Sequence, residues 1–149
     1  MSTLTKTGPG ERGEKFPILA PCVVTASFLW DVMTTMVESS YDWFTFRNVA
    51  RRPDTDADEH EDDPLSVTGF TVFEVEEDAE TLADAPRWQI GPAEVIAAMA
   101  QIAGNPLSTS PGNRACILSA LAEDDAGQID SDAADCILQI ATFGELRYG

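Results

Sequence analysis

The placement of charge constrains the fold of this chain more than any other feature. The 149 residues include 26 acidic and 9 basic side chains, a formal net charge of −17 at pH 7. Residues 1–52 are nearly balanced, with six basic and five acidic groups, whereas residues 53–149 hold three basic and 21 acidic groups. Between Pro53 and Asp84 there are thirteen carboxylates and no lysine or arginine. Charged side chains are almost never buried unpaired, so the core must come from the segments around these acidic runs.

The length and composition predict one folded domain. A chain of 149 residues can build its own core, and a hydrophobic content of 44% is ordinary for a globular protein. Residues 1–15 are polar and aperiodic, which predicts a flexible N-terminal tail before a single domain at 16–149. No apolar run approaches the ~18–20 residues that span a bilayer, and the N-terminal segment lacks a secretory pattern. We therefore expect a cytoplasmic protein.

Two strands are predicted on either side of the densest acidic run, after a first helix. Apolar side chains recur at spacings of three and four from Phe28 to Met36, the pattern of an amphipathic helix that Thr25 or Ser27 would cap. Tyr41–Val49 is rich in aromatic and β-forming residues, and Leu65–Glu76 places alternate apolar side chains on one face. The connecting segment 51–64 is expected to be an exposed acidic loop. Because a two-stranded ribbon is marginal, a third strand is expected. Its candidates are Val23–Ala26 and Leu146–Tyr148.

The C-terminal half is predicted to be mostly helical. Three further helices are expected, at 92–103, 113–122 and 131–143. Pro92 suits the first turn of one of them, Asp130 or Ser131 would cap the last, and Gly144 would end it in a left-handed conformation. The fold class is therefore α+β, a small antiparallel sheet of two to three strands packed with about four helices.

Two acidic segments resemble part of a calcium-binding loop, and neither completes the pattern. Asp54, Asp56 and Asp58 alternate as the first ligands of such a loop do. However, Glu59 stands where a glycine is needed, and Leu65 stands where the bidentate glutamate belongs. The second segment, 123–135, lacks three of the oxygen ligands, so its Asp130 and Asp132 are interpreted as helix cap and first-turn charges. No metal site is predicted, with loose divalent binding by the first cluster as the alternative.

The inventory of nucleophiles does not predict catalysis. Cys22, Cys116 and Cys136 share no short zinc-binding spacing, and the last two are interpreted as small buried hydrophobic residues. His60 is the only histidine and lies within the acidic run, a poor place to activate a thiol. Phosphate-binding glycine loops, G-x-S-x-G and H-E-x-x-H are all absent from the sequence. We expect no catalytic residue and no cofactor, and hence not an enzyme.

Several short motifs follow one another in a characteristic order. They are Asp31–Glu38 with Tyr41-Asp42-Trp43, Gly91-Pro92-Ala93-Glu94, Asn113-Arg114, Asp130–Ile137, and the ending Phe143-Gly144-Glu145 with Tyr148-Gly149. In these motifs the chain resembles small uncharacterised acidic proteins of actinobacterial phages and prophages, over about residues 28–149. It departs from them at Ser39-Ser40, where they often have two glycines, and in a longer acidic loop at 53–63. The resemblance implies a phage origin and an accessory role in the host cytosol, and no functional residue carries over from it.

The leading functional hypothesis is a non-enzymatic accessory protein that binds a protein partner with a basic surface. The acidic field would repel nucleic acid and anionic membranes, so neither is an expected partner. The acidic surface predicted to bind comprises Asp54, Asp56, Asp58, Glu59, Glu61, Asp62, Asp63, Glu74, Glu76, Glu77 and Asp78. One alternative is a DNA mimic that inhibits a host DNA-binding protein, although mimicry needs carboxylates on rigid elements. Another is a self-assembling structural or virion component, which an exposed aromatic strand at Tyr41–Phe46 would favour.

Overall fold

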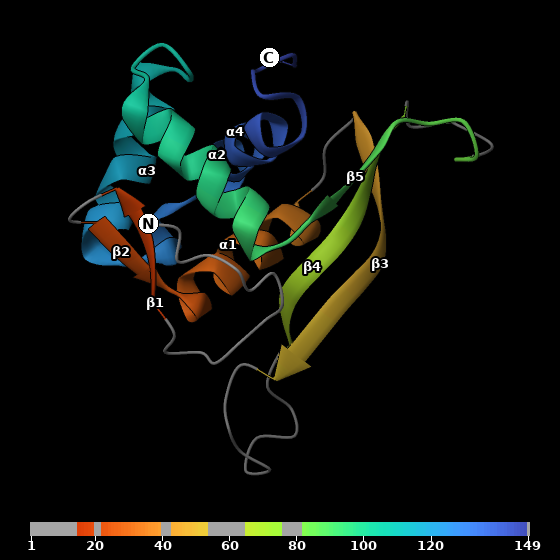
Figure 1. Ribbon diagram of the computed structural model, residues 1–149, viewed down its shortest axis with the longest axis horizontal. Helices are drawn as coiled ribbons and strands as arrows, with labels where there is room; N and C mark the ends of the chain where they lie inside the picture. The colour runs from red at the N-terminus through yellow and green to blue at the C-terminus, as the bar shows by residue number, and fades with distance from the viewer. Residues whose placement is uncertain (1–14, 20–21, 40–42, 54–64, 76–81, 149) are drawn as a thin grey trace.

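The structure is a computed structural model of the chain and describes residues 15–19, 22–39, 43–53, 65–75 and 82–148. Its strands are β1 (Lys15–Leu19), β2 (Cys22–Thr25), β3 (Phe44–Pro53), β4 (Leu65–Glu74) and β5 (Arg87–Ile90). Its helices are α1 (Ala26–Glu38), α2 (Pro92–Gly104), α3 (Pro111–Glu123), the 3₁₀ turn η1 (Ala126–Gln128) and α4 (Ser131–Phe143). The α+β class, the three-stranded antiparallel sheet and the largely helical C-terminal half are confirmed. Figure 1 shows the sheet on one side of the helices and the β1–β2 hairpin at the opposite end.

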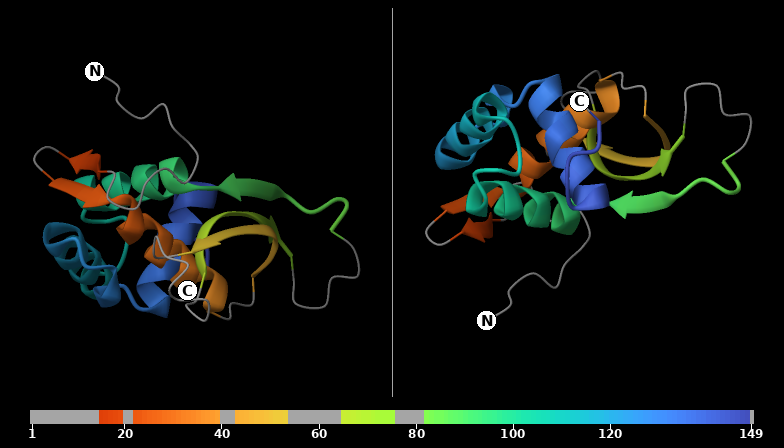
Figure 2. Two further views of the ribbon diagram at one scale, coloured as in Figure 1. Left: turned by 90° about the horizontal axis from the view of Figure 1, so that it is seen from below. Right: turned by 90° about the horizontal axis from the view of Figure 1, so that it is seen from above.

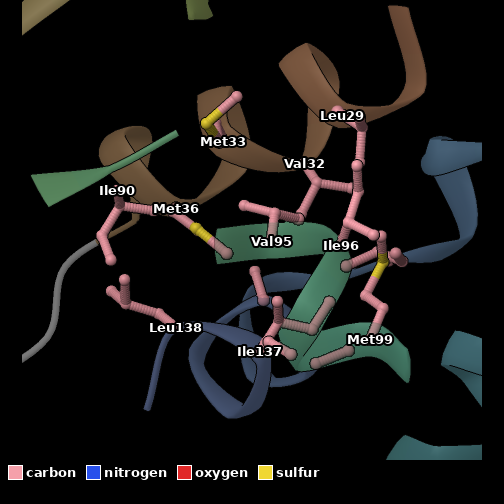
Figure 3. Close-up of a cluster of buried hydrophobic side chains, with 14 of the residues drawn as sticks. Leu29, Val32, Met33, Met36, Ile90, Val95, Ile96, Met99, Ile137 and Leu138 are labelled. Carbon is pink, nitrogen blue, oxygen red and sulfur yellow. The ribbon is translucent and has the colours of Figure 1, made fainter. Parts of the chain in front are cut away.

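The core forms where α1 meets α2 and α4. Thr25 caps α1 as expected, since its hydroxyl accepts a hydrogen bond from the Phe28 amide at 3.2 Å. The views in Figure 2 place α1 between the hairpin and the sheet, and it packs against β4 as well as against α4. Figure 3 shows side chains of these elements meeting in one cluster, namely Leu29, Val32, Met33, Met36, Ile90, Val95, Ile96, Met99, Ile137 and Leu138. Each such side chain, when fully buried, stabilises the fold by about 1.5–3 kcal/mol.

The sheet has the order β3-β4-β5, and its third strand was not among the predicted candidates. Val23–Ala26 largely forms β2, which pairs with β1 in a separate hairpin, and residues 146–148 form no strand. The third strand is β5, which follows the acidic stretch that ends at Asp84, and it pairs with Phe70–Phe73 of β4. In β5 the exposed residues Arg87 and Gln89 alternate with the less exposed Trp88 and Ile90, and this pattern covers only four positions.

The predicted boundary between the second element and the acidic loop was also wrong. The expected loop began at residue 51, but β3 continues to Pro53, where it pairs with Leu65. Arg52 is half-buried because its guanidinium lies over the Trp30 ring, 4.6 Å from the ring centroid. An arginine stem can cover apolar surface in this way while its charge stays near water. The remainder of the predicted loop, 54–64, lies outside the described residues, as does the predicted tail up to residue 14.

The caps predicted for the last helix are confirmed. The Asp130 carboxylate accepts a hydrogen bond from the Ala133 amide at 2.8 Å, and Gly144 ends α4 with φ of 77°. The helix expected to start at residue 113 begins earlier, at Pro111, because Ser110 caps it through the Asn113 amide. Within the described ranges, each helix is too short or too polar to traverse a bilayer.

Candidate functional site

One residue of the predicted acidic surface, Glu74, lies in the described part of the chain. Its side chain is 20% exposed, and its carboxylate accepts a hydrogen bond from the Tyr148 hydroxyl at 2.5 Å. The Arg147 guanidinium lies 3.9 Å from the other carboxylate oxygen. Glu74 therefore anchors residues near the end of the chain. The other ten residues of that surface lie outside the described ranges: Asp54, Asp56, Asp58, Glu59, Glu61, Asp62, Asp63, Glu76, Glu77 and Asp78.

Two of the basic side chains in the acidic part of the chain bind backbone carbonyl groups. The Arg114 guanidinium donates to the carbonyls of Ile102 and Ala103 at 3.0 and 2.8 Å, at the C-terminal end of α2. Helix C-termini present unpaired carbonyls and partial negative charge, so a cation is favourable there. Arg87 likewise donates to two carbonyls, those of Leu82 and Ala83. Both guanidinium groups therefore make their hydrogen bonds within the fold.

A set of exposed carboxylates that sequence reasoning did not select lies where α3 ends and α4 begins. We call it the acidic corner, and it consists of Glu123, Asp124, Asp125, Asp130 and Asp132. Their hydrogen-bond donors are neutral, for example the Gln128 side-chain amide, which donates to Glu123 at 2.7 Å. Among the residues that the structure describes, none of the five has a basic partner. The clustering of five carboxylates within ten residues was the signal in the sequence, where the segment was compared with a calcium-binding loop and only Asp130 and Asp132 were interpreted, as cap and first-turn charges.

Capping contacts hold the acidic corner in place. Asp124 is the C-cap of α3 with φ of 50°, and its carboxylate accepts from the Thr25 amide at the start of α1 at 3.0 Å. Asp125 caps η1 through the Gly127 amide, and Asp130 caps α4. Negative charge is favourable at the N-terminus of a helix. The corner therefore presents its charge from defined positions on ordered helix ends. In the described ranges, no group of three or more potential ligands is arranged to hold a metal ion.

A second polar cluster surrounds Gln139 on α4. Its side chain is 1% exposed, yet it makes four hydrogen bonds. The amide nitrogen donates to Asp135 at 2.9 Å and to the Tyr148 carbonyl at 3.0 Å. The amide oxygen accepts from the backbone nitrogens of Arg147 and Tyr148, both at 2.8 Å. A side chain thus fixes residues 147–148, and the candidate strand at Leu146–Tyr148 does not form.

Aromatic rings enclose this cluster. Trp43 stacks on Tyr148 with centroids 5.2 Å apart, and its indole nitrogen donates to Asp135 at 2.8 Å. Burial raises the pKa of Asp135, while the hydrogen bonds from Trp43 and Gln139 oppose that rise. Of the aromatic residues in the strand predicted at Tyr41–Phe46, Trp43 and Phe44 are 7% and 8% exposed and Phe46 is half-buried, while Tyr41 lies outside the described residues.

The two described thiols have structural surroundings. Burial, followed by the charge of Asp135, raises the pKa of Cys136 to about 11, and the Asn113 amide nitrogen lies 3.4 Å from its sulfur. A thiol with such a pKa is almost wholly protonated at neutral pH and is a poor nucleophile. The Cys116 thiol donates to the Gln128 carbonyl. These contacts agree with the interpretation of both as packing residues.

Two surface hollows lie within the described structure. One, of about 390 Å³, lies beside the end of β5 and contains Glu94, and the other, of about 320 Å³, lies near Leu107 and contains Glu145. An enzyme would be favoured by a deep pocket with two carboxylates and either Arg47 or Arg87. Neither of these two hollows has that arrangement.

Comparison of the chain with protein-family models, with curated proteins and with solved structures gives no match. A function must therefore be inferred from the residues of this chain.

Proposed function

We propose that this protein is a non-enzymatic, phage-type accessory protein that acts in the host cytosol by binding a protein with a basic surface. The observation that carries the proposal is the uncompensated charge of the acidic corner. Its five carboxylates are exposed, and those of Glu123, Asp124, Asp125 and Asp130 accept hydrogen bonds from neutral donors. Arg87 and Arg114, which are basic residues of the same part of the chain, bind backbone carbonyls instead.

Such a surface acts mainly on the rate and selectivity of encounter. Charge of one sign steers a partner of the opposite sign and repels partners of like sign, such as nucleic acid or an anionic membrane. The Debye length is about 10 Å at 0.1 M salt, so the attraction between exposed charges weakens as salt is added. Capture of the partner should therefore be strongest at low ionic strength.

The test removes charge from the corner while keeping its caps. Asparagine caps a helix about as well as aspartate, so Asp124→Asn, Asp125→Asn and Asp130→Asn combined should preserve the fold. The matched control removes three exposed carboxylates elsewhere, through Glu38→Gln, Asp84→Asn and Glu145→Gln. Each tagged protein is used to capture partners from an actinobacterial lysate at low and moderate salt, with identification by mass spectrometry. We expect the corner variant to lose a basic partner that the control retains.

Equal capture by the corner variant and the control would contradict the role of the corner. A further variant then locates the surface, with the seven carboxylates of the predicted loop neutralised: Asp54, Asp56, Asp58, Glu59, Glu61, Asp62 and Asp63. Loss of capture in this variant alone would assign binding to the loop. Capture that survives in every variant and at moderate salt would contradict an acidic binding surface altogether.

A second candidate function is DNA mimicry, which the acidic corner favours for a specific reason. Mimicry requires carboxylates at defined positions, and those of Asp124, Asp125 and Asp130 each accept a hydrogen bond from a backbone amide. A DNA mimic would capture a DNA-binding protein, and added duplex DNA would compete with it. Competition by DNA for the captured partner supports mimicry, while capture unaffected by DNA supports an ordinary protein interface.

A further inference from the structure

The hollow of about 390 Å³ lies in a notch of the sheet, where β5 ends and α2 begins. Figure 1 shows β5 leading directly into α2 beside β4. β5 pairs with β4 only as far as Phe70, so the part of β4 that precedes Phe70 has no β5 neighbour. The volume is within the lower part of the range found for small-molecule sites.

Two irregularities of the sheet open this notch. The β3–β4 register shifts on both sides of Ala50, and Asn48 adopts φ of 55°. Bulges of this kind bend a strand and are common beside binding sites, and a non-glycine residue with positive φ is unusual. At the notch, β4 carries Gly69, where an added Cβ would lie 3.3 Å from the Ile90 carbonyl oxygen. The glycine allows the end of β5 to approach β4 closely.

The notch contains two threonine residues whose hydroxyl groups are not used by the rest of the described structure. Thr68 and Thr71 line it and are only 6% and 7% exposed. In the part of the chain that the structure describes, neither hydroxyl has a hydrogen-bond partner. Neither hydroxyl oxygen is itself fully buried, so both remain accessible to a molecule in the notch. A ligand with hydrogen-bonding groups can therefore pair with them.

The remaining lining defines the chemistry of that molecule. Glu94 is half-buried, and one of its carboxylate oxygens accepts from the Gly91 amide at 2.8 Å. No basic residue lines the notch, while Phe70 and Ile90 give it an apolar surface. We infer that this notch binds a primary ammonium group carried on a small apolar stem. The Glu94 carboxylate binds the ammonium group, and the threonine hydroxyl oxygens accept its further hydrogen bonds. This site is independent of the acidic corner and of the proposed function.

The test is an NMR titration of the full chain with tyramine, a small primary amine with an apolar ring and a hydroxyl group. 4-Ethylphenol, which lacks the ammonium group, is the matched ligand. We expect saturable shifts of backbone amides in 68–71 and 89–94 with tyramine, and binding of 4-ethylphenol at least ~10-fold weaker because charge-assisted hydrogen bonds are the stronger ones. Absence of saturable shifts up to about 10 mM tyramine would overturn the inference.

Two variants and a control assign the contacts. Glu94→Gln keeps the oxygen that accepts from Gly91, as a glutamine does in a capping box, but it removes the charge. It should weaken tyramine binding at least ~10-fold. Thr71→Val replaces a hydroxyl with a methyl group of similar size and should weaken it a further, smaller amount. The control Asp84→Asn removes an exposed charge elsewhere and should change binding less than ~2-fold. Equal effects of Glu94→Gln and Asp84→Asn would show non-specific attraction and overturn the inference.

The same ammonium chemistry occurs in free amines and in the lysine side chains of proteins. A parallel titration with N-acetyl-lysine methylamide separates these sources. Binding of tyramine alone supports a site for a free small amine. Binding of both at the same amides supports the ammonium site and extends it to lysine side chains. Binding of neither contradicts it.

Discussion

Replacement of Gln139 by leucine tests how the last residues of the chain are held. Leucine keeps most of the buried volume but removes the amide, and with it all four hydrogen bonds. If residues 147–148 stay in place, their three backbone groups and one oxygen of Asp135 lose their partner. Each of these partly buried hydrogen bonds contributes about 1 kcal/mol, so the loss of all four disfavours this state by ~4 kcal/mol.

Release of the segment is the less costly response. Water then satisfies the backbone groups, and each freed residue regains about 1 kcal/mol or more of backbone entropy. The released segment loses its hydrogen bonds to Gln139 and the stacking of Tyr148 on Trp43, which is worth about 0.5–1.5 kcal/mol. We therefore expect Gln139→Leu to lower the free energy of unfolding by about 2 kcal/mol, below the ~4 kcal/mol of the docked state.

Urea unfolding measures that free energy, and amide hydrogen exchange shows where the change occurs. The amides of Arg147 and Tyr148 should lose protection while those of α1 keep it. Gln101→Leu is the control, since Gln101 is exposed and makes one hydrogen bond near the same segment, to the Gly144 carbonyl at 2.6 Å. It should cost less than ~1 kcal/mol. Retained protection at 147 and 148 in Gln139→Leu would refute the role of Gln139.

The remaining predictions concern titration, labelling and capping. Burial raises the pKa of Asp135 above its ordinary 3.8, so folding favours the protonated carboxyl group. The stability that this group contributes is fully present below pH 3.8. It is lost as the pH rises through the raised pKa. Urea unfolding of Asp135→Asn should therefore show a stability that improves relative to the natural protein across that window. A pKa of about 11 should make Cys136 react with iodoacetamide at pH 8 at least ~10-fold more slowly in the folded than in the unfolded protein, as peptide mass spectrometry can measure. Asp130→Ala should cost about 1 kcal/mol in thermal or urea unfolding and Asp130→Asn less than ~0.5 kcal/mol, because asparagine retains the cap.

The helices were predictable because their signals are local. The apolar stripe of α1 and its cap at Thr25 lie within a few residues of each other, as do Asp130 and Gly144 at the ends of α4. β5 was missed because its pattern spans four residues beside an acidic stretch, and pairing with β4 defines it. The end of β3 was missed because Arg52 was interpreted as a loop charge, whereas it packs over Trp30, 22 positions earlier.

Sites that depend on contacts between distant segments left little signal in the sequence. Gln139 lies among the apolar residues 136–141, which is unusual for a buried face, but the sequence does not show that its partners follow eight and nine residues later. The notch beside β5 depends on the register shifts around Ala50, and no glycine or proline among residues 47–51 of the sequence indicates them. The acidic corner was visible as a cluster, and the structure adds which backbone amide each capping carboxylate binds.

Capping explains the positions of the Asp125 and Asp130 carboxylates but not their charge. A cap requires an oxygen acceptor, and neutral serine and asparagine serve about as well as aspartate. This chain itself uses neutral caps, Thr25 for α1 and Ser110 for α3. Carboxylates gathered within ten residues repel one another, and this repulsion opposes the favourable effect of Asp130 and Asp132 at the N-terminus of α4. The fold therefore does not require the charge of the acidic corner. Attraction of a basic partner is a reason for that charge, and the Asp-to-Asn variants test it directly because they retain the caps.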